Sequence, residues 1–435
     1  MTSPTTKPGR PTPWRKRPLF VLAYLIFLLA LAEGGAWTYL AVSGRGVDLD
    51  AEAELVGGRA GVDMDAMARQ GGRGAATVVA EELHPYLGFM PHMTAGGGPG
   101  NQLYQVWQQR TYEPGSPLFS TDPDDLVIGL VGGSVARQFG MYGGAAHLAQ
   151  SLPRTERFRG RRVRFVCVAY GGAKQPQQLM GLSYLLALGG RLDLLINLDG
   201  FNEIALHEVD NQPQGVAPIY PRAWFHRVGR SELMGLFGER SFVQAERERA
   251  LEGLAGSPLA LSGLRRARWV ARDRELEAEL VRLGEALRVF DPTTSRTALG
   301  PVSSAADAAG RLAELAAIWE RSSRQLANLC AANGIEYHHF LQPNQYVEGS
   351  KPLSDEELAR AYLPDQGYGA QAPAGYPLLL AAGAELAADG VRFHDLTDVY
   401  RDVEETVYKD TCCHVNELGN LLMAEAMLAA FAAVR

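Results

Sequence analysis

The chain has 435 residues, 46% of them hydrophobic and 21% charged, and its formal net charge at pH 7 is -7. This apolar fraction excludes a disordered or fibrous protein, and the length allows one large folded domain or two modest ones. The acidic balance excludes the broad basic surface that holds a phosphate backbone, so we expect no nucleic-acid partner.

The N-terminal segment has the composition of a membrane anchor. Residues 1–17 contain five basic residues and no acidic one, whereas residues 18–42 are almost entirely apolar. At about 1.5 Å per residue, a helix of this length spans the roughly 30 Å hydrocarbon core of a bilayer. Because basic flanks stay in the cytoplasm, we expect a single-pass membrane helix with its N-terminus inside. Residues 1–17 would then be cytoplasmic and the bulk of the chain extracytoplasmic.

The same segment allows a second interpretation. Glu33 interrupts the apolar run, and Ala30-Leu31-Ala32 before it has the small-residue pattern of a signal-peptidase site. Cleavage after Ala32 would give a secreted or periplasmic protein. The uncleaved anchor is favoured, because the apolar run continues after Glu33 with Trp37 and Tyr39 in positions typical of interfacial aromatic residues.

The chain after the anchor divides into a linker and a folded domain. Residues 43–83 are rich in Gly, Ala and acidic residues and have weak periodicity, which predicts a stalk or linker. Residues 84–435 contain apolar runs that alternate with amphipathic stretches. The runs predict buried strands at 125–133, 162–170, 192–200, 335–343 and 391–396, and the stretches predict helices at 175–188, 305–332 and 376–388. Strands that alternate with helices indicate an α/β fold, a doubly wound parallel sheet of about five strands.

One segment departs from this alternation. Residues 231–289 are charged and amphipathic, and they separate the third predicted strand from the helix before the fourth. We expect an inserted helical hairpin with a solvated outer face. A lid or a partner-docking cap is the alternative, because insertions above the carboxyl ends of strands lie over the ligand crevice.

A serine follows the first predicted strand at Leu126–Gly140, LVIGLVGGSVARQFG. In a doubly wound sheet, ligands bind where strand carboxyl ends meet helix N-termini, and Ser134 lies at such a point. Gly132 and Gly133 permit a tight turn and the close approach of a substrate oxygen. A serine hydroxyl needs a base to act as a nucleophile. By itself the GGS stretch also fits a helix N-cap.

Two further stretches supply the missing groups. Gly200 and Asn202 follow the third predicted strand in LDGFNEI, where a side-chain amide can donate to an oxyanion. His414 precedes the terminal helix in KDTCCHVNELGN, with Asn416 as the expected N-cap. The sequence therefore predicts that a hydroxyl, an amide and an imidazole meet at one edge of the sheet.

These stretches, in this order, resemble the conserved blocks of the SGNH (GDSL-type) hydrolases, flavodoxin-like serine esterases and acyltransferases. VGGSVA matches the nucleophile block at Ser134, with GGS in place of GDS. AYGGAKQPQQL matches the second block and implies an oxyanion-hole backbone N–H at Gly172, with Gly171 as the alternative. The third block, G-x-N-D, matches the stretch from Gly200 through Asn202, with glutamate in place of the aspartate.

The last block departs from the family pattern. The family has D-x-x-H, whereas Asp410 lies four residues before His414 and Thr411 occupies the position of the acid. One extra loop residue can be absorbed by a bulge, so we expect Asp410 to orient His414. HPYLGF at 84–89 and LQPNQY at 341–346 are also similar to stretches of membrane-anchored bacterial members, and we assign them no chemistry.

The resemblance implies a serine esterase or acyltransferase. Ser134 would attack an ester carbonyl, His414 would take its proton, and Asp410 would fix the imidazole tautomer. The oxyanion hole would consist of the N–H groups of Ser134 and Gly172 with the Asn202 amide. The implied substrate carries ester-linked acyl groups outside the cytoplasm, as acylated polysaccharide or lipid does.

Two alternatives stay open. Gly132-x-Ser134-x-Ala136 approximates the G-x-S-x-G elbow of α/β-hydrolases, but that fold needs several strands before its serine. The second alternative is a catalytically inactive, membrane-anchored accessory protein that keeps the fold and binds glycan. The altered spacing of the last block is its main support.

The remaining reactive side chains have simpler interpretations. We expect no cofactor and no metal, because the adjacent Cys412 and Cys413 chelate zinc poorly, and Cys167 and Cys330 are expected to be buried thiols. His338 and His339 alternate in a predicted strand and are assigned to packing. His207 and Trp224 follow the Asn202 block and are candidates for lining the pocket.

Overall fold

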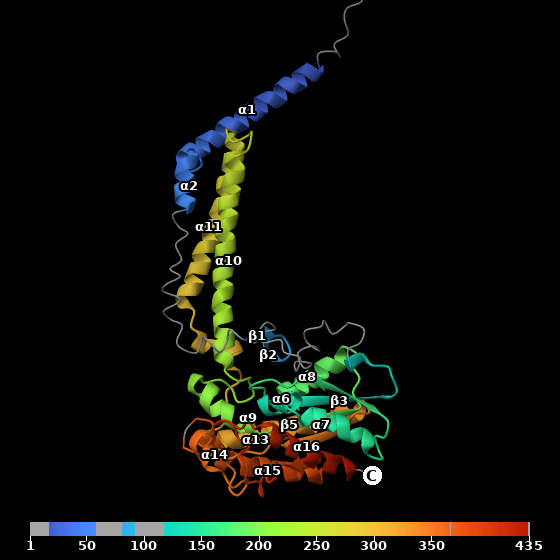
Figure 1. The fold of residues 1–435 in the computed structure, drawn as a ribbon. Coiled ribbons are helices and arrows are strands. Elements are labelled where there is room, and N and C mark those ends of the chain that lie inside the picture. Colours follow the sequence, from blue (N-terminus) through green and yellow to red (C-terminus); the bar gives the residue numbers. More distant parts are fainter. Residues whose placement is uncertain (1–16, 58–80, 92–116, 366, 434–435) are drawn as a thin grey trace, which may run out of the picture. The chain divides into compact units, whose positions relative to one another are not determined.

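The structure is a computed structural model that describes residues 17–57, 81–91, 117–365 and 367–433 (Figure 1). The chain divides into two compact units. One consists of Met1–Gln70 and Ser231–Phe290, and the other of Gly71–Arg230 and Asp291–Arg435.

The second unit is built on a five-stranded parallel sheet. Its strands lie in the order β4-β3-β5-β6-β7, and their bounds are β3 Asp125–Gly132, β4 Arg162–Cys167, β5 Leu194–Asp199, β6 Glu336–Leu341 and β7 Arg392–Asp395. Each lies within a predicted strand, so the predicted α/β class and the parallel five-stranded sheet are confirmed. The strand order reverses direction at β3, and such a reversal opens a crevice at the carboxyl ends of the strands.

Both faces of the sheet are covered, which explains the continuous apolar runs in the strands. Alternate residues of β3 point to opposite faces, Leu126, Ile128 and Leu130 to one and Val127 and Val131 to the other. The first face packs against α6, α7, α15 and α16, and the second against α8 and the C-terminal half of α13. The helix bounds are α6 Ser134–Met141, α7 Gly144–Ser151, α8 Gln177–Ala187, α9 Phe201–Leu206, α12 Arg296–Leu299, α13 Ala308–Ala332, α14 Asp355–Arg360, α15 Ala372–Ala388 and α16 Glu417–Ala432.

A short antiparallel hairpin precedes the sheet in the chain. Its strands are β1 Glu81–His84 and β2 Gly88–Pro91. Phe89 is buried and packs edge-on against Tyr170, with the ring centroids 5.5 Å apart. The HPYLGF stretch therefore contributes to packing beside the end of β4.

The first unit consists of helices. Its elements are α1 Arg17–Ser43, α2 Leu49–Gly57, the part of α10 (Trp224–Ala255) after residue 230, and α11 Gly263–Val289. Residues Pro18–Ser43 of α1 have the length and composition of a membrane-crossing helix or a signal sequence, with a mean hydropathy of 2.1 over 18 residues. The two long helices α10 and α11 occupy the segment predicted as a helical insertion. Helix α2 lies in the segment predicted as a linker, of which residues 58–80 are outside the described part of the chain.

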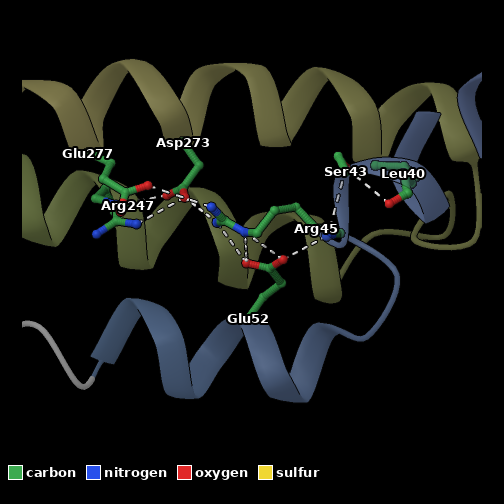
Figure 2. Close-up of polar contacts among 8 residues, drawn as sticks. Leu40, Ser43, Arg45, Glu52, Arg247, Asp273 and Glu277 are labelled. Atoms are coloured by element: carbon green, nitrogen blue, oxygen red, sulfur yellow. Dashed lines mark hydrogen bonds and ion pairs between the residues drawn. The ribbon is translucent and has the colours of Figure 1, made fainter.

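A network of ion pairs joins three segments of this unit (Figure 2). The guanidinium of Arg45 donates to both carboxylate oxygens of Glu52 at 2.9 Å and to Asp273 at 2.7 Å. Asp273 also accepts two hydrogen bonds, at 2.8 and 2.9 Å, from Arg247, whose side chain is fully buried. Burial raises the pKa of Asp273, but its hydrogen bonds with Arg247 and Arg45 outweigh that effect and leave the pKa below its usual value. Glu277 lies 3.6 Å from Arg45 as a fifth charge. The network thus holds the chain after α1 against the hairpin formed by α10 and α11.

Buried histidines stabilise the middle of the sheet. His339 accepts or donates hydrogen bonds with Asp199 at 2.8 Å and Ser323 at 2.7 Å, and His338 with His394 at 2.9 Å. The two side chains point to opposite faces of β6 and are fully buried. They take part in packing and in hydrogen bonds within the sheet, and Asp199 is the last residue of β5, directly before Gly200.

We predict that acid destabilises this unit through its buried histidines. Burial and neighbouring positive charge lower the pKa of His394 to about 4, and they also lower the pKa of His207 to about 4. In the unfolded chain these histidines bind protons near pH 6.5. Their contribution to the free energy of unfolding is therefore fully present above that pH and is lost as the pH decreases from about 6.5 to about 4. Asparagine does not titrate, so the thermal unfolding midpoint of His394→Asn is expected to decrease less between pH 7 and pH 5 than that of the wild type. An equal loss in both proteins would contradict this assignment.

Candidate active site

Ser134 is the first residue of α6, directly beyond the carboxyl end of β3. Gly132 has a φ of +144°, and a Cβ there would lie 2.1 Å from the carbonyl oxygen of Leu198 in the neighbouring strand β5. At Gly133 a Cβ would lie 2.1 Å from Nδ2 of Asn202. Both positions therefore require glycine, because a side chain would overlap neighbouring atoms of the protein. The expected room for a substrate oxygen is occupied at these two positions by the end of β5 and by the Asn202 amide.

His414 lies within hydrogen-bond distance of the serine. Its Nε2 is 2.7 Å from Oγ of Ser134, and its Nδ1 is 2.6 Å from Oδ2 of Asp410. With Nδ1 donating its proton to the carboxylate, Nε2 is left as an acceptor for the serine hydroxyl proton. The imidazole is mostly buried, with 18% of its side chain exposed. The three residues thus form the hydroxyl, base and acid arrangement of a serine nucleophile.

The loop around Asp410 shows how the longer spacing to His414 is accommodated. Oδ1 of Asp410 accepts hydrogen bonds from the backbone N–H groups of Cys412 at 3.0 Å, Cys413 at 3.3 Å and His414 at 3.4 Å. The extra residue is absorbed in a turn that closes on the carboxylate itself, and Oδ2 remains free to accept from the imidazole. Burial raises the pKa of Asp410, but its hydrogen bond with His414, the imidazole charge and the backbone donors outweigh it and lower the pKa below its usual value. Asp410 is therefore ionised at neutral pH.

Asn202 and Glu203 connect the loop after β4 to the turn after β5. Nδ2 of Asn202 donates to the carbonyl oxygen of Ala173 at 2.8 Å. The buried carboxylate of Glu203 accepts from the N–H groups of Gly200 and Gln175, both at 2.9 Å. Burial and the nearby Asp199 raise the pKa of Glu203. Glu203 thus bridges two loops through backbone donors.

Gly172 lies beside this bridge, under an arginine side chain. Its φ is +74°, and a Cβ there would lie 2.7 Å from Cδ of Arg222. Arg222 is held by hydrogen bonds to Asp210 at 2.8 Å and to the hydroxyl of Tyr368 at 3.2 Å. At Gly171, the alternative, a Cβ would meet nothing within 4 Å. The backbone therefore requires glycine at 172 and tolerates a side chain at 171.

Several residues of the site were missed in the sequence. Nε2 of Gln345 donates to the carbonyl oxygen of Asp410 at 3.0 Å, and the hydroxyl of Tyr346 donates to that of Thr411 at 2.6 Å. Both belong to the LQPNQY stretch that follows β6. The position of these polar side chains just beyond the carboxyl end of a strand could have identified them as site residues. Arg222 was also not predicted, because it lies in a loop without any periodic pattern.

Of the two residues that the sequence suggested for lining the pocket, His207 is buried and Trp224 is hydrogen-bonded elsewhere. His207 is 1% exposed, and burial with the charge of Lys174 lowers its pKa to about 4. The indole of Trp224 donates to the carbonyl oxygen of Thr297 at 2.8 Å. Asn416, the expected N-cap of the terminal helix, accepts from the N–H of Gly419 at 3.0 Å.

The cysteines beside His414 bear on metal binding. Ligand atoms of Cys412, Cys413 and His414 lie within 4.8 Å of one another, although the sequence predicts no metal. Both ring nitrogens of His414 are already hydrogen-bonded to Ser134 and Asp410. A metal ion at this position would therefore compete with the hydroxyl, base and acid arrangement.

No protein-family model matches the chain, and no curated protein shows significant similarity to it.

We predict that Gly133 and Asn202 are energetically coupled. Gly133→Ala is expected to cost about 1 to 3 kcal/mol, because its Cβ overlaps the Asn202 amide. In the double variant with Asn202→Ala the overlap is gone, so its loss should be smaller than the sum of the single losses by about 1 kcal/mol. Denaturant unfolding of the four proteins measures this coupling.

The matched control is Gly171→Ala, where the added methyl group meets open space. A change of less than about 0.5 kcal/mol is expected there. Additive losses for positions 133 and 202 would show that the amide does not fill the space beside Gly133.

Proposed function

We propose that the chain is a serine esterase or acyltransferase of the SGNH type. The observation that carries this proposal is the continuous pair of hydrogen bonds from Ser134 through His414 to Asp410, at 2.7 and 2.6 Å. The serine lies at the N-terminus of α6, where backbone N–H groups favour negative charge. The order of blocks along the chain also supports it, as does the position of β3 between β4 and β5, where the strand order of the sheet reverses.

In the proposed reaction, Oγ of Ser134 attacks the ester carbonyl while Nε2 of His414 takes the hydroxyl proton. The C–O bond to the alcohol then breaks, and His414 returns the proton to the departing alcohol. Asp410 holds the imidazole in the required tautomer and stabilises its charged form. The N–H groups of Ser134 and Gly172 and the amide of Asn202 are the proposed donors to the oxyanion. The acyl group finally passes to water or to another hydroxyl.

The accessory, inactive alternative is less well supported by the geometry. Its basis was the extra residue between Asp410 and His414, and the turn at Cys412 and Cys413 brings the carboxylate to the imidazole despite it. The proposed substrate is an ester-bearing molecule outside the cytoplasm, such as acylated polysaccharide or lipid. The proposed location, with α1 as an uncleaved inner-membrane anchor and the N-terminus in the cytoplasm, supports this choice.

The direct test is covalent labelling of the full-length protein with a fluorophosphonate. We expect the label on Ser134 in the wild type, no label in Ser134→Ala, and a labelling rate lowered by roughly 10⁶ in His414→Ala, because the hydroxyl loses its base. Ser183→Ala, at a serine whose hydroxyl donates to the carbonyl oxygen of Leu179 in its own helix α8, is the matched control and should label normally. Folded wild-type protein that stays unlabelled at neutral pH would favour the accessory alternative.

Asp410 has two roles that a pair of variants separates. Asp410→Asn keeps an oxygen for the backbone donors but places an amide against Nδ1 of His414, so kcat for p-nitrophenyl acetate is expected to fall by about 10³ to 10⁴ with little loss of stability. Asp410→Ala should lose similar activity and, in addition, about 1 kcal/mol of stability from the unsupported turn. Near-normal kcat in Asp410→Asn would show that another group orients the imidazole.

A further inference from the structure

Glu33, the acidic residue within the apolar helix α1, has hydrogen-bond partners in the hairpin formed by α10 and α11. Its carboxylate accepts hydrogen bonds from the N–H groups of Gly263 at 2.6 Å and Leu264 at 3.3 Å, and from the hydroxyl of Ser262. These are the first groups of α11, where a helix has unsatisfied N–H donors and the positive end of its dipole. An acidic residue in a membrane-spanning helix is costly unless it is paired. Here the start of α11 supplies the pairing.

The contact between α1 and α11 continues beyond Glu33. A Cβ at Gly263 would lie 2.7 Å from the ring of Trp37, so this glycine allows the helices to touch. The guanidinium of Arg266 lies over the Trp37 ring at 5.2 Å and donates to the carbonyl oxygen of Val47 at 2.6 Å. Arg274 donates to the hydroxyl of Tyr39 at 2.9 Å. Successive turns of α11 therefore follow the end of α1, up to the ion-pair network in Figure 2.

The turn between α10 and α11 and the first residues of α11 expose leucines beside this contact. Leu259, Leu261 and Leu264 are 59%, 80% and 39% exposed. Large apolar side chains rarely gather on a solvated turn without a partner. On α1, the residues before Glu33 are also exposed and apolar, Leu25 and Leu31 among them. The leucines of the turn thus extend an apolar surface that the proposed anchor presents to lipid.

The depth of the turn follows from the length of α1. A hydrocarbon core of roughly 30 Å takes about 20 residues of helix, which places its outer boundary near Trp37 when the span begins at Pro18. Trp37 and Tyr39 then lie at the membrane–water interface, where such residues concentrate. The start of α11 is bound between Glu33 and Trp37, so it lies at the same boundary. Arg265 and Arg268, both exposed, follow the turn at the level where phosphate groups occur.

We infer that residues 256–264, which comprise the α10–α11 turn and the first two residues of α11, form a second membrane contact of this protein. Leu259, Leu261 and Leu264 insert among the acyl chains of the outer leaflet beside α1, and Arg265 and Arg268 face lipid phosphates. The occupant of this surface is a phospholipid bilayer. The inference rests on the proposed membrane anchor and is independent of the proposed esterase activity.

The test uses full-length protein in nanodiscs of phosphatidylcholine and phosphatidylglycerol, with an environment-sensitive fluorophore at single cysteines. The background is Cys412→Ser, because Cys167, Cys330 and Cys413 are buried. Probes are placed at Leu261→Cys in the turn, at Leu25→Cys in α1, and at Val281→Cys, a 61% exposed position further along α11. Quenching by lipids that carry bromine on the acyl chain reports contact with the membrane interior.

We expect quenching at position 261 to exceed that at position 281 by roughly twofold or more, because an inserted turn reaches about 5 to 10 Å below the surface. Strong quenching at 25 with equal, weak quenching at 261 and 281 would overturn the inference while leaving the anchor intact. Weak quenching at 25 would instead overturn the anchor, and the inference with it. Glu33→Ala should lower the quenching at 261 and leave that at 25 unchanged, because the turn loses its attachment to α1. Unchanged quenching at 261 in this variant would contradict the attachment through Glu33.

Discussion

The candidate site depends on how closely the ends of β3 and β5 approach each other. The carbonyl oxygen of Leu198 and the amide of Asn202 occupy the space that side chains would take at positions 132 and 133. Because Gly133 has no side chain, the Asn202 amide can pass it and reach Ala173 in the loop after β4. Three loops that are distant in the chain are thus tied at one edge of the sheet. Ser134, the next residue, takes its position from this contact.

The position of His414 depends on a different set of contacts, at the end of β6. Tyr346 and Gln345 hold the carbonyl oxygens of Thr411 and Asp410, and Asp410 holds the N–H groups that follow it. The carboxylate thus uses one oxygen to shape the loop and the other to orient the imidazole. This division explains how the carboxylate reaches the imidazole although Asp410 lies four residues before His414.

The predictable part of the structure follows from periodicity and chain order. Continuous apolar runs locate all five strands, because strands covered on both faces have no polar side, and the carboxyl ends of β3 and β5 bring Ser134 and Asn202 to one edge. The position of His414 before the terminal helix predicted its imidazole at the same edge, whereas the role of Asp410 was expected only through the family resemblance. Arg222 and Tyr346 were not predicted, because they lie in loops whose paths depend on tertiary contacts. The role of the paired glycines was misjudged, since a sequence does not show that Leu198 and Asn202 fill the space beside them.

The α10–α11 hairpin shows what periodicity alone cannot predict. Helix α11 buries one stripe of side chains, Trp269, Asp273 and Leu276 among them, but the amphipathic pattern does not identify the segment that packs against it. The apolar core of this unit is small, with Leu40, Val56 and Val270 among its buried members. Arg45 and Asp273 supply what the apolar pattern lacks. A buried charge is costly without a partner, so a shift of α11 by one turn would leave Asp273 buried and unpaired. We therefore interpret the network as the feature that sets the register between the hairpin and the chain after α1. That register also brings the start of α11 to Glu33, whose partners are 229 to 231 residues away in the sequence.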